Sequence, residues 1–302
     1  MFNWKVYISK YPDLHFMKTR QQAIRHFIHF GKKENRTDKI QVKNEVKNEV
    51  KIEVKNKNIL KYNLDLTRLP DCDCNYKINT FKLNTFKLDS LDLRNKLPPC
   101  YDQGQLGSCT ANALVGAYEF LNPKFFGSRL FLYYNERKRQ NSINYDSGST
   151  VVAGIKSLHK TGLCKESLWV YNIKKFNIKP KPICYRIALK NKIIKYYNVI
   201  QTLDGMKSYI NSGFPFVVGI AIYSSFESQT VADTGIVPMP SENDSYLGGH
   251  CVLVCGYTNT SWICRNSWGT NWGEQGYFYL PYDYLLNPNL CSDNWCIESD
   301  TT

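Results

Sequence analysis

Residues 101–121 read YDQGQLGSCTANALVGAYEFL, and the rest of the chain is best interpreted outward from this stretch. Two glycines, Gly104 and Gly107, predict a turn that leads into Ser108 and Cys109. From there apolar residues recur at helical spacing, which predicts a helix that begins at the cysteine and buries one face. These residues are Ala113, Ala117, Tyr118 and Leu121.

A cysteine at the start of a helix is suited to act as a nucleophile. The first helical turn presents unpaired N–H groups and a partial positive charge, which favour an anion and so lower the pKa of a thiol. A single cysteine is usually an inert core residue, but the helix start and the glycine turn favour the nucleophile for Cys109. Gln103, six residues earlier, offers an amide donor of the kind that stabilises an oxyanion.

A thiolate nucleophile needs a group that carries protons, and the chain has five histidines. His15, His26 and His29 lie in the N-terminal segment, and His159 lies in a helix-like stretch, SLHKTG. His250 lies in YLGGHCVLVCGY, where we expect a Gly-Gly turn to open an alternating apolar strand. His250 is therefore the candidate base.

Asn266 follows His250 by sixteen residues, within RNSWGTNWGEQGYFYLP. An asparagine can accept a hydrogen bond from one imidazole nitrogen while the other nitrogen faces the thiol. A strand histidine and a turn asparagine are often structural, but His250 is the only histidine in the second half of the expected domain. We therefore expect Cys109, His250, Asn266 and Gln103 to form a catalytic site.

The blocks QGQLGSC, GGHCVLVCGY and RNSWGTNWGEQGYF follow one another in this order. Together they resemble the papain (C1) family of cysteine peptidases, in which Cys, His and Asn occur in the same order. LPPCYDQGQLGSCTANA is similar to a bacterial and large-DNA-virus, cathepsin-like branch of that family. The resemblance covers residues from about 93 to near the C-terminus. It implies an α+β fold in which a helical lobe faces an antiparallel, β-barrel-like lobe across a cleft.

The resemblance implies a hydrolase that cleaves peptide or protein substrates without a cofactor or metal. Cys109 and His250 would form an ion pair, and Gln103 with the backbone N–H of Cys109 would hold the tetrahedral oxyanion. Asn266 would orient His250. Chain-end-trimming relatives carry a histidine on a loop across the cleft, and since His159 looks helical we expect an endopeptidase.

Four further residues are expected at or beside the bound substrate. By resemblance, Gly148 forms the glycine edge that pairs with the substrate backbone, although the usual Gly-Gly is Gly148-Ser149 here. The backbone carbonyl of Gly249 would meet the substrate, and Trp268 would shield the His–Asn hydrogen bond from water. Thr110 stands where the family commonly has Trp, so the packing beneath the cleft must differ.

Two other function classes remain open on the sequence. A catalytically silent interaction protein could keep this fold, but a pure binder needs none of the four polar catalytic residues. A thiol acyl transferase such as a transglutaminase-like enzyme generally uses Asp as its third member, which Asn266 disfavours.

The 302 residues are enough for one two-lobed domain with an extension. We expect a small helical module at residues 1–36, a low-complexity linker or propeptide at 37–90, and the peptidase at 91–302. Residues 1–62 carry 15 Lys/Arg against 6 Asp/Glu, so the extension can contact its own cleft or an acidic partner, although a basic tail is commonly just solvated. NTFKLNTFKL, at residues 79–88, could lie along a groove, which suggests an autoinhibited precursor.

No stretch is apolar for long enough to span a membrane, and the N-terminus lacks the features of a signal peptide. We therefore expect a cytoplasmic or virion-associated protein, with no nucleic-acid partner. Eleven cysteines leave the disulfide pattern open. Zinc binding by Cys72 and Cys74 with Cys291 and Cys296 is disfavoured, because neither pair has CxxC spacing.

Overall fold

The computed structural model describes residue 11, residue 64 and residues 88–299. The chain divides into two units, residues 1–56 and residues 57–302, and apart from Tyr11 all described residues belong to the second. The helical module expected at 1–36, the low-complexity stretch at 42–56 and nearly all of the duplication at 79–88 lie outside the described residues, as do Cys72 and Cys74.

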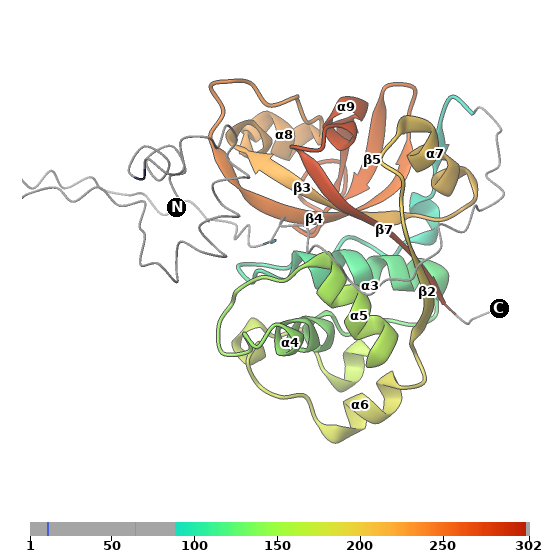
Figure 1. Cartoon of the computed structure of the whole chain (residues 1–302), viewed down its shortest axis with the longest axis vertical. Coiled ribbons are helices and arrows are strands. Elements are labelled where there is room, and N and C mark those ends of the chain that lie inside the picture. The colour runs from blue at the N-terminus through green and yellow to red at the C-terminus, as the bar shows by residue number, and fades with distance from the viewer. Residues whose placement is uncertain (1–10, 12–63, 65–87, 300–302) are drawn as a thin grey trace, which may run out of the picture. The chain divides into compact units, whose positions relative to one another are not determined.

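Helices dominate the first half of the described region. The helix expected from Cys109 is confirmed as α3 (Cys109–Leu121), and the helix-like stretch around His159 lies in α5 (Val151–Lys160). Helices α4 (Arg129–Arg139) and α6 (Pro182–Ala188) complete this lobe. Short 3-10 turns are η3 (Arg94–Lys96), η4 (Glu166–Leu168) and η5 (Ile173–Lys175). Helix α3 lies against the sheet, and α6 lies at the end of the lobe remote from the sheet (Figure 1).

The second half forms an antiparallel sheet in the order β2-β7-β3-β4-β5-β6, with β1 also paired to β4. Its strands are β1 (Leu91–Asp92), β2 (Ile193–Asn198), β3 (Phe216–Tyr223), β4 (Tyr246–Tyr257), β5 (Ser261–Arg265), β6 (Tyr277–Pro281) and β7 (Cys291–Ser299). Around it lie α7 (Leu203–Asn211), η6 (Ser224–Glu227), α8 (Gln229–Thr234) and α9 (Tyr282–Leu286). The expected α+β arrangement of a helical lobe and an antiparallel lobe is confirmed.

The expectation of a Gly-Gly turn before His250 is wrong. Strand β4 already begins at Tyr246, and Gly248 and Gly249 pair with Ile222 and Ala221 of β3. The long apolar strand β3 offers backbone partners along this whole stretch, so glycines that contribute no side chain still extend the ladder. His250 is therefore held inside a paired strand.

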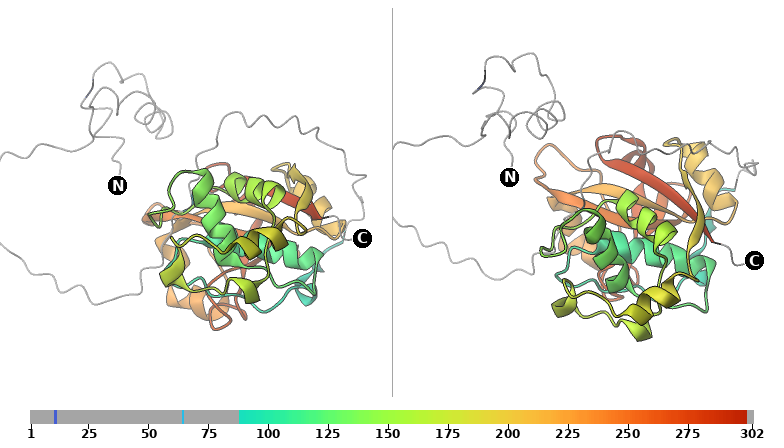
Figure 2. Two further views of the ribbon diagram at one scale, coloured as in Figure 1. Left: turned by 90° about the horizontal axis from the view of Figure 1, so that it is seen from below. Right: turned by 60° about the horizontal axis from the view of Figure 1, so that its bottom comes forward.

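Helix α3 is buried on all sides, whereas its sequence pattern predicted one buried face. Every residue from Cys109 to Phe120 is buried, because α3 lies between the sheet and helices α4 and α5 (Figure 2). The one charged side chain of the helix, Glu119, accepts hydrogen bonds from the Tyr101 hydroxyl (2.8 Å) and the Gly127 N–H (2.8 Å). This pairing offsets the cost of burying a carboxyl group.

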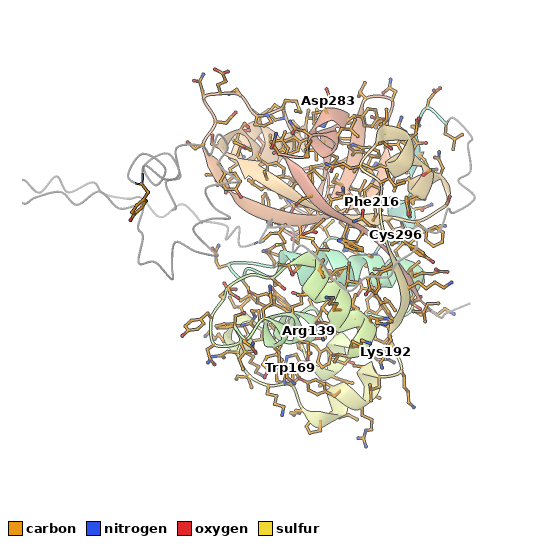
Figure 3. All side chains as sticks on the ribbon, viewed as in Figure 1. Arg139, Trp169, Lys192, Phe216, Asp283 and Cys296 are labelled. Atoms are coloured by element: carbon orange, nitrogen blue, oxygen red, sulfur yellow. The ribbon has the colours of Figure 1, made fainter. Side chains whose placement is uncertain are left out.

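Two large hydrophobic clusters fill the two lobes. In the sheet, Phe216 of β3 is paired with Cys296 of β7 and meets the ring of Trp262 edge to face at 6.3 Å (Figure 3). The nine described cysteines are all free and buried. Among the described residues, no helix is long and apolar enough to cross a membrane.

Two glycines that follow helices test how closely the helical lobe is packed. Gly162 (φ +82°) and Gly213 (φ +81°) have the same left-handed backbone, but a Cβ on Gly162 would lie 1.9 Å from the Ala188 carbonyl oxygen, whereas one on Gly213 meets nothing within 4 Å. Gly213→Ala should lower the free energy of unfolding by about 1 kcal/mol, and Gly162→Ala by roughly 2–4 kcal/mol. Chemical denaturation of both variants measures this difference, and equal losses would contradict the close approach.

Candidate active site

The thiol of Cys109 is fully buried at the first residue of α3. Burial raises the pKa of Cys109 to about 12, while the backbone N–H groups of Cys251, Thr110 and Cys109 itself act in the opposite direction. Cys251 directly follows His250 in β4. The sulfur therefore lies against the strand that carries the histidine, and two segments far apart in the sequence meet at this atom.

His250 is oriented by Asn266. The Nε2 atom of His250 lies 2.9 Å from the Asn266 Oδ1 atom, and because an amide oxygen can only accept, Nε2 donates this bond. A neutral ring with its proton on Nε2 carries its lone pair on Nδ1, which is then the nitrogen that can take a proton. The Ser267 backbone N–H also donates to Asn266 Oδ1 (2.8 Å) and fixes the amide orientation.

Trp268 packs directly on His250, the position that its expected shielding role requires. Its ring stacks on His250 with centroids 5.1 Å apart and an interplanar angle of 30°. Phe226 and Trp272 pack edge to face against Trp268 in turn (5.6 and 4.8 Å). The aromatic cluster keeps the imidazole fully buried, and this burial lowers the pKa of His250 to about 4 although the Asn266 hydrogen bond raises it.

Both catalytic candidates are therefore neutral at neutral pH in this structure. A thiol with a pKa of about 12 holds its proton, and an imidazole with a pKa of about 4 takes none. The resemblance to papain relatives implies an ion pair instead. The physical reason for the difference is desolvation, since neither Cys109 nor His250 has any exposed surface here and burial disfavours both charged forms.

Gln103 is positioned so that its amide N–H₂ group is the end available to an oxyanion. Its Oε1 atom accepts a hydrogen bond from the Ser267 hydroxyl, and its backbone N–H donates to the Ser267 carbonyl (2.8 Å). One hydrogen of Nε2 is donated to the Leu106 carbonyl (2.8 Å). The amide has two such hydrogens, so the second can serve a reacting carbonyl. Ser267 thus orients both Gln103 and Asn266, a role that the sequence analysis missed although Ser267 lies inside the NSWG block.

An arginine holds the loop of Gln103 in place. The Arg129 guanidinium lies between the rings of Tyr101 (4.2 Å) and Tyr171 (4.0 Å). The Tyr171 hydroxyl donates to the Gln103 carbonyl (2.9 Å) and lies 2.6 Å from the Ser108 hydroxyl, next to the nucleophile. These contacts fix both sides of the turn that precedes α3.

The predicted substrate edge, Gly148 and Ser149, forms hydrogen bonds with residues of the helical lobe. Gly148 is buried with φ +69°, and its N–H donates to the Tyr133 hydroxyl (3.2 Å). The Ser149 hydroxyl donates to Gln140 Oε1 (2.9 Å) and therefore faces the helical lobe. Their substrate-binding role stays a prediction.

The carbonyl of Gly249 is already used by another part of the chain. The Leu64 backbone N–H donates to it at 3.1 Å. Leu64 is 6% exposed and belongs to the same hydrophobic cluster as Cys109 and Cys251. A segment upstream of the predicted peptidase domain therefore occupies the acceptor that the resemblance assigns to the substrate.

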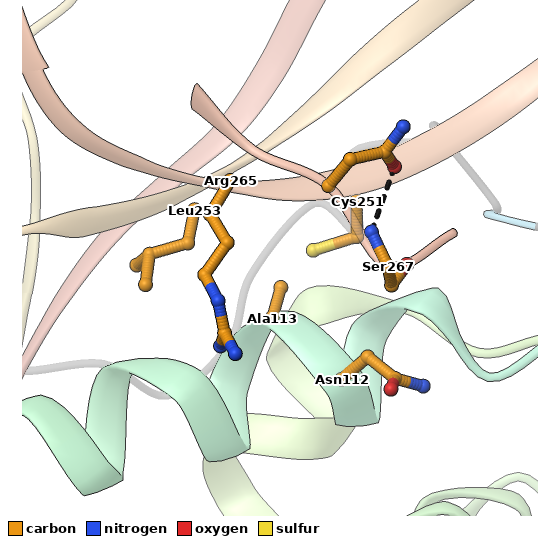
Figure 4. Close-up of a pocket in the computed structure, with 7 residues that line it drawn as sticks. Asn112, Ala113, Cys251, Leu253, Arg265 and Ser267 are labelled. Carbon is orange, nitrogen blue, oxygen red and sulfur yellow. Dashed lines mark hydrogen bonds between the residues drawn. The ribbon is translucent and has the colours of Figure 1, made fainter. Parts of the chain in front are cut away.

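A small cavity lies behind the site, between α3 and strands β4 and β5 (Figure 4). It has room for about one water molecule, which is far too little for a peptide side chain. We therefore do not assign it to substrate. Its walls are formed by Asn112, Ala113, Cys251, Leu253, Arg265, Asn266 and Ser267.

A buried carboxyl group next to Cys109 was not foreseen. Thr110, which follows Cys109, donates its hydroxyl hydrogen to Glu136 Oε2 at 2.7 Å. Burial raises the pKa of Glu136 to about 8, although Thr110, the charge of Arg137 and the Ser149 hydroxyl lower it. A negative charge on Glu136 raises the pKa of Cys109. No sequence signal links these residues, because Glu136 lies in a different helix within a highly charged stretch.

Comparison with known proteins identifies the family. Residues 88–292 match the model of the papain family cysteine proteases. An uncharacterised peptidase C1-like protein of Acanthamoeba polyphaga mimivirus is 44% identical over 216 residues, which are 66% of this chain and 70% of that protein. Peptidase 1 of Dermatophagoides pteronyssinus is 26% identical over 69% of this chain and 65% of its own length.

A solved structure agrees. Xylellain, a cysteine protease from Xylella fastidiosa, superimposes with a TM-score of 0.72 and 36% identity over 83% of this chain and 100% of that chain. The chain belongs to the papain family of cysteine peptidases. Both the bacterial and the large-DNA-virus resemblance of the sequence are confirmed.

Glu136 gives a testable pH dependence for the thiol. Below pH 8 Glu136 is protonated and neutral, so Glu136→Gln should alkylate at Cys109 with iodoacetamide at the wild-type rate. Above pH 8 the wild-type carboxylate opposes the thiolate, so the variant should react faster, by up to about tenfold for a shift of one pKa unit. Mass spectrometry of the Cys109 peptide measures both rates.

The matched control is Glu119→Gln. Glu119 is another buried carboxyl, whose pKa is raised by burial to about 7, but it lies near the other end of α3. It should leave the pH profile of Cys109 alkylation unchanged. Identical profiles for the two variants would show that Glu136 exerts no specific effect on the thiol.

Proposed function

We propose that the chain is a cysteine endopeptidase that acts through Cys109, His250 and Asn266. The hydrogen bond between His250 Nε2 and Asn266 Oδ1 carries this proposal, because it leaves Nδ1 as the basic nitrogen on the strand that contacts the sulfur. The family match supports the reaction class, and substrates are then peptides or proteins.

The reaction begins when Cys109 gives its proton to His250 Nδ1. The thiolate attacks the carbonyl carbon of the peptide bond, and the oxyanion accepts hydrogen bonds from Gln103 Nε2 and the backbone N–H of Cys109. The imidazolium then protonates the leaving amine. Water, deprotonated by His250, attacks the thioester carbonyl, and the acyl group leaves as a carboxylic acid while the thiol is restored.

Cleavage within the chain is favoured over removal of terminal residues. His159, the other histidine of the described residues besides His250, lies in α5 with its Nδ1 atom 3.0 Å from the Ile193 carbonyl. Its ring packs on Tyr196 at 5.6 Å. Strand β2 thus engages this side chain, so His159 is not free to recognise the end of a substrate.

We further propose that the segment around Leu64 inhibits the site. The Leu64 N–H uses the Gly249 carbonyl, so a substrate backbone cannot pair with the same acceptor at the same time. The buried Leu64 side chain also joins the cluster that includes the nucleophile. Removal of this segment would let water reach Cys109 and His250, which reduces the desolvation that keeps both neutral.

An active-site-directed epoxide tests the enzyme directly. We expect it to label Cys109 after residues 1–87 are removed, and we expect this truncated protein to cleave an internal bond of a peptide blocked at both ends. Cys109→Ala should abolish both labelling and cleavage, while the other buried cysteines remain unlabelled. Absence of labelling in both the full and the truncated chain would favour a silent binding protein. Release of C-terminal dipeptides would overturn the endopeptidase assignment.

A proline at position 64 tests the inhibition separately. Leu64→Pro removes the N–H donor but keeps an apolar side chain, so the full-length variant should hydrolyse peptides roughly two- to tenfold faster, the equivalent of one hydrogen bond. Leu64→Met keeps the N–H and serves as the matched control. Equal rates for the two variants, with a truncated form that is no faster, would exclude inhibition by this segment.

A further inference from the structure

The positive charge of the second unit is concentrated in one segment. Residues 165–195 contain nine Lys/Arg and one Glu, whereas the rest of residues 57–302 contain 17 Lys/Arg and 19 Asp/Glu. The basic character of the chain therefore does not belong only to the N-terminal extension. The peptidase carries its own basic segment on an otherwise slightly acidic body.

This segment forms one end of the helical lobe. It runs through η4, η5 and α6 into β2, and the α6 end of the lobe lies away from the sheet (Figures 1 and 2). We call its exposed part the basic face. Eight of the nine basic side chains of the segment are exposed, namely Lys165, Lys174, Lys175, Lys179, Lys181, Arg186, Lys190 and Lys195.

These charges are not neutralised within the described structure. Of the nine basic side chains of the segment, Lys195 alone forms an ion pair among the described residues, with Glu298 at 3.7 Å. Its one acid, Glu166, lies 3.9 Å from Arg129 on the inner side. The basic face is thus complementary to an anionic partner.

Exposed aliphatic side chains alternate with these lysines. Val170 is 62% exposed, Leu189 59% and Ile178 49%, and Ile173 adjoins Lys174. The aromatic side chains of the segment are turned inward, since Trp169 is buried and Tyr171 and Phe176 are only partly exposed. The surface therefore offers lysines and aliphatic groups, with a single arginine and no exposed ring.

We propose that the basic face docks on the surface of an anionic lipid bilayer. Lysines are attracted to acidic headgroups, and the aliphatic side chains between them can enter the boundary of the acyl chains. Single-stranded nucleic acid would favour exposed aromatic rings for stacking, and base or phosphate recognition would favour arginine forks. The chemistry of the face therefore fits lipid better than nucleic acid.

The α6 part of the basic face lies away from the catalytic site. Cys109 begins α3, which lies against the sheet, whereas α6 lies at the opposite end of the same lobe (Figure 1). Trp169 and Lys192 mark the helical lobe in Figure 3. A bilayer that meets the α6 part of the basic face would lie at the end of the lobe opposite to Cys109.

Vesicle flotation tests the proposal on the full-length chain with Cys109→Ala, which prevents self-cleavage. We expect co-flotation with vesicles of phosphatidylcholine mixed with phosphatidylserine, lost at high salt, and none with phosphatidylcholine alone. Lys174→Glu, Lys175→Glu and Lys179→Glu together should weaken binding by about tenfold or more, since each lysine near such a surface contributes about fivefold.

The matched control reverses three exposed charges outside residues 165–195, with Lys96→Glu, Lys138→Glu and Arg139→Glu. Both variants have the same net charge and keep the basic N-terminal extension. If the chain bound vesicles through that extension or through its overall charge, the two variants would lose the same amount of binding. Circular dichroism and thermal melting verify that both fold. Equal loss of binding in the two variants would overturn the proposal.

The aliphatic residues separate lipid from other anionic partners. Val170→Ser with Ile178→Ser should weaken vesicle binding further while leaving the binding of polyglutamate or a DNA duplex unchanged. Binding to vesicles that is unaffected by these two substitutions would assign the face to an acidic polymer. Tight binding to DNA without vesicle binding would assign it to nucleic acid, and either result would overturn the lipid assignment.

Discussion

Burial of helix α3 on every side is the constraint on which the rest of the structure depends. A helix without a solvent face must satisfy each polar group that it carries. Asn112 donates to the Ser108 carbonyl (2.9 Å) and accepts from Arg129 (3.1 Å), and Glu119 accepts from Tyr101 and Gly127. The partners come from the chain before the helix and from the segment that leads into α4. The bonds that make burial of the helix tolerable therefore also fix the turn that carries Gln103.

The same helix joins the two lobes. Gly116 leaves room for the Arg265 guanidinium, since a Cβ there would lie 2.4 Å from the Arg265 Nη1 atom. Arg265 in turn donates to the carbonyls of Pro98 and Pro99 (3.1 and 2.6 Å), the residues that lead into the catalytic turn. Asn266 follows Arg265 directly, so the contact that fixes the interface also sets the position of the residue that orients His250.

The sequence predicted those parts of the fold that depend on local pattern. The helix that begins at Cys109, the helical position of His159 and the strand that carries His250 follow from local pattern, and the order of Cys109, His250 and Asn266 predicted the family. Strands β2 and β7 were not foreseen. The sequence of β7, CSDNWCIES, does not alternate regularly between polar and apolar residues, and β7 is held in the sheet by its pairing with β2 and β3. Contacts between remote segments, such as Leu64 with Gly249, leave no trace in local spacing.

The hydrogen bond between Thr110 and Glu136 shows how burial requires a contact between residues that are remote in the sequence. Neither residue has exposed surface, and each isolated polar group would be costly at this depth. A hydroxyl in place of the large ring common in the family needs an acceptor, and a carboxyl group in the neighbouring helix supplies it at 2.7 Å. The second oxygen fits because Gly154 has no side chain, since a Cβ there would lie 2.6 Å from Glu136 Oε1. A change at position 110 thus imposes requirements at two positions in two other helices, and it places a titratable group where its charge acts on the nucleophile.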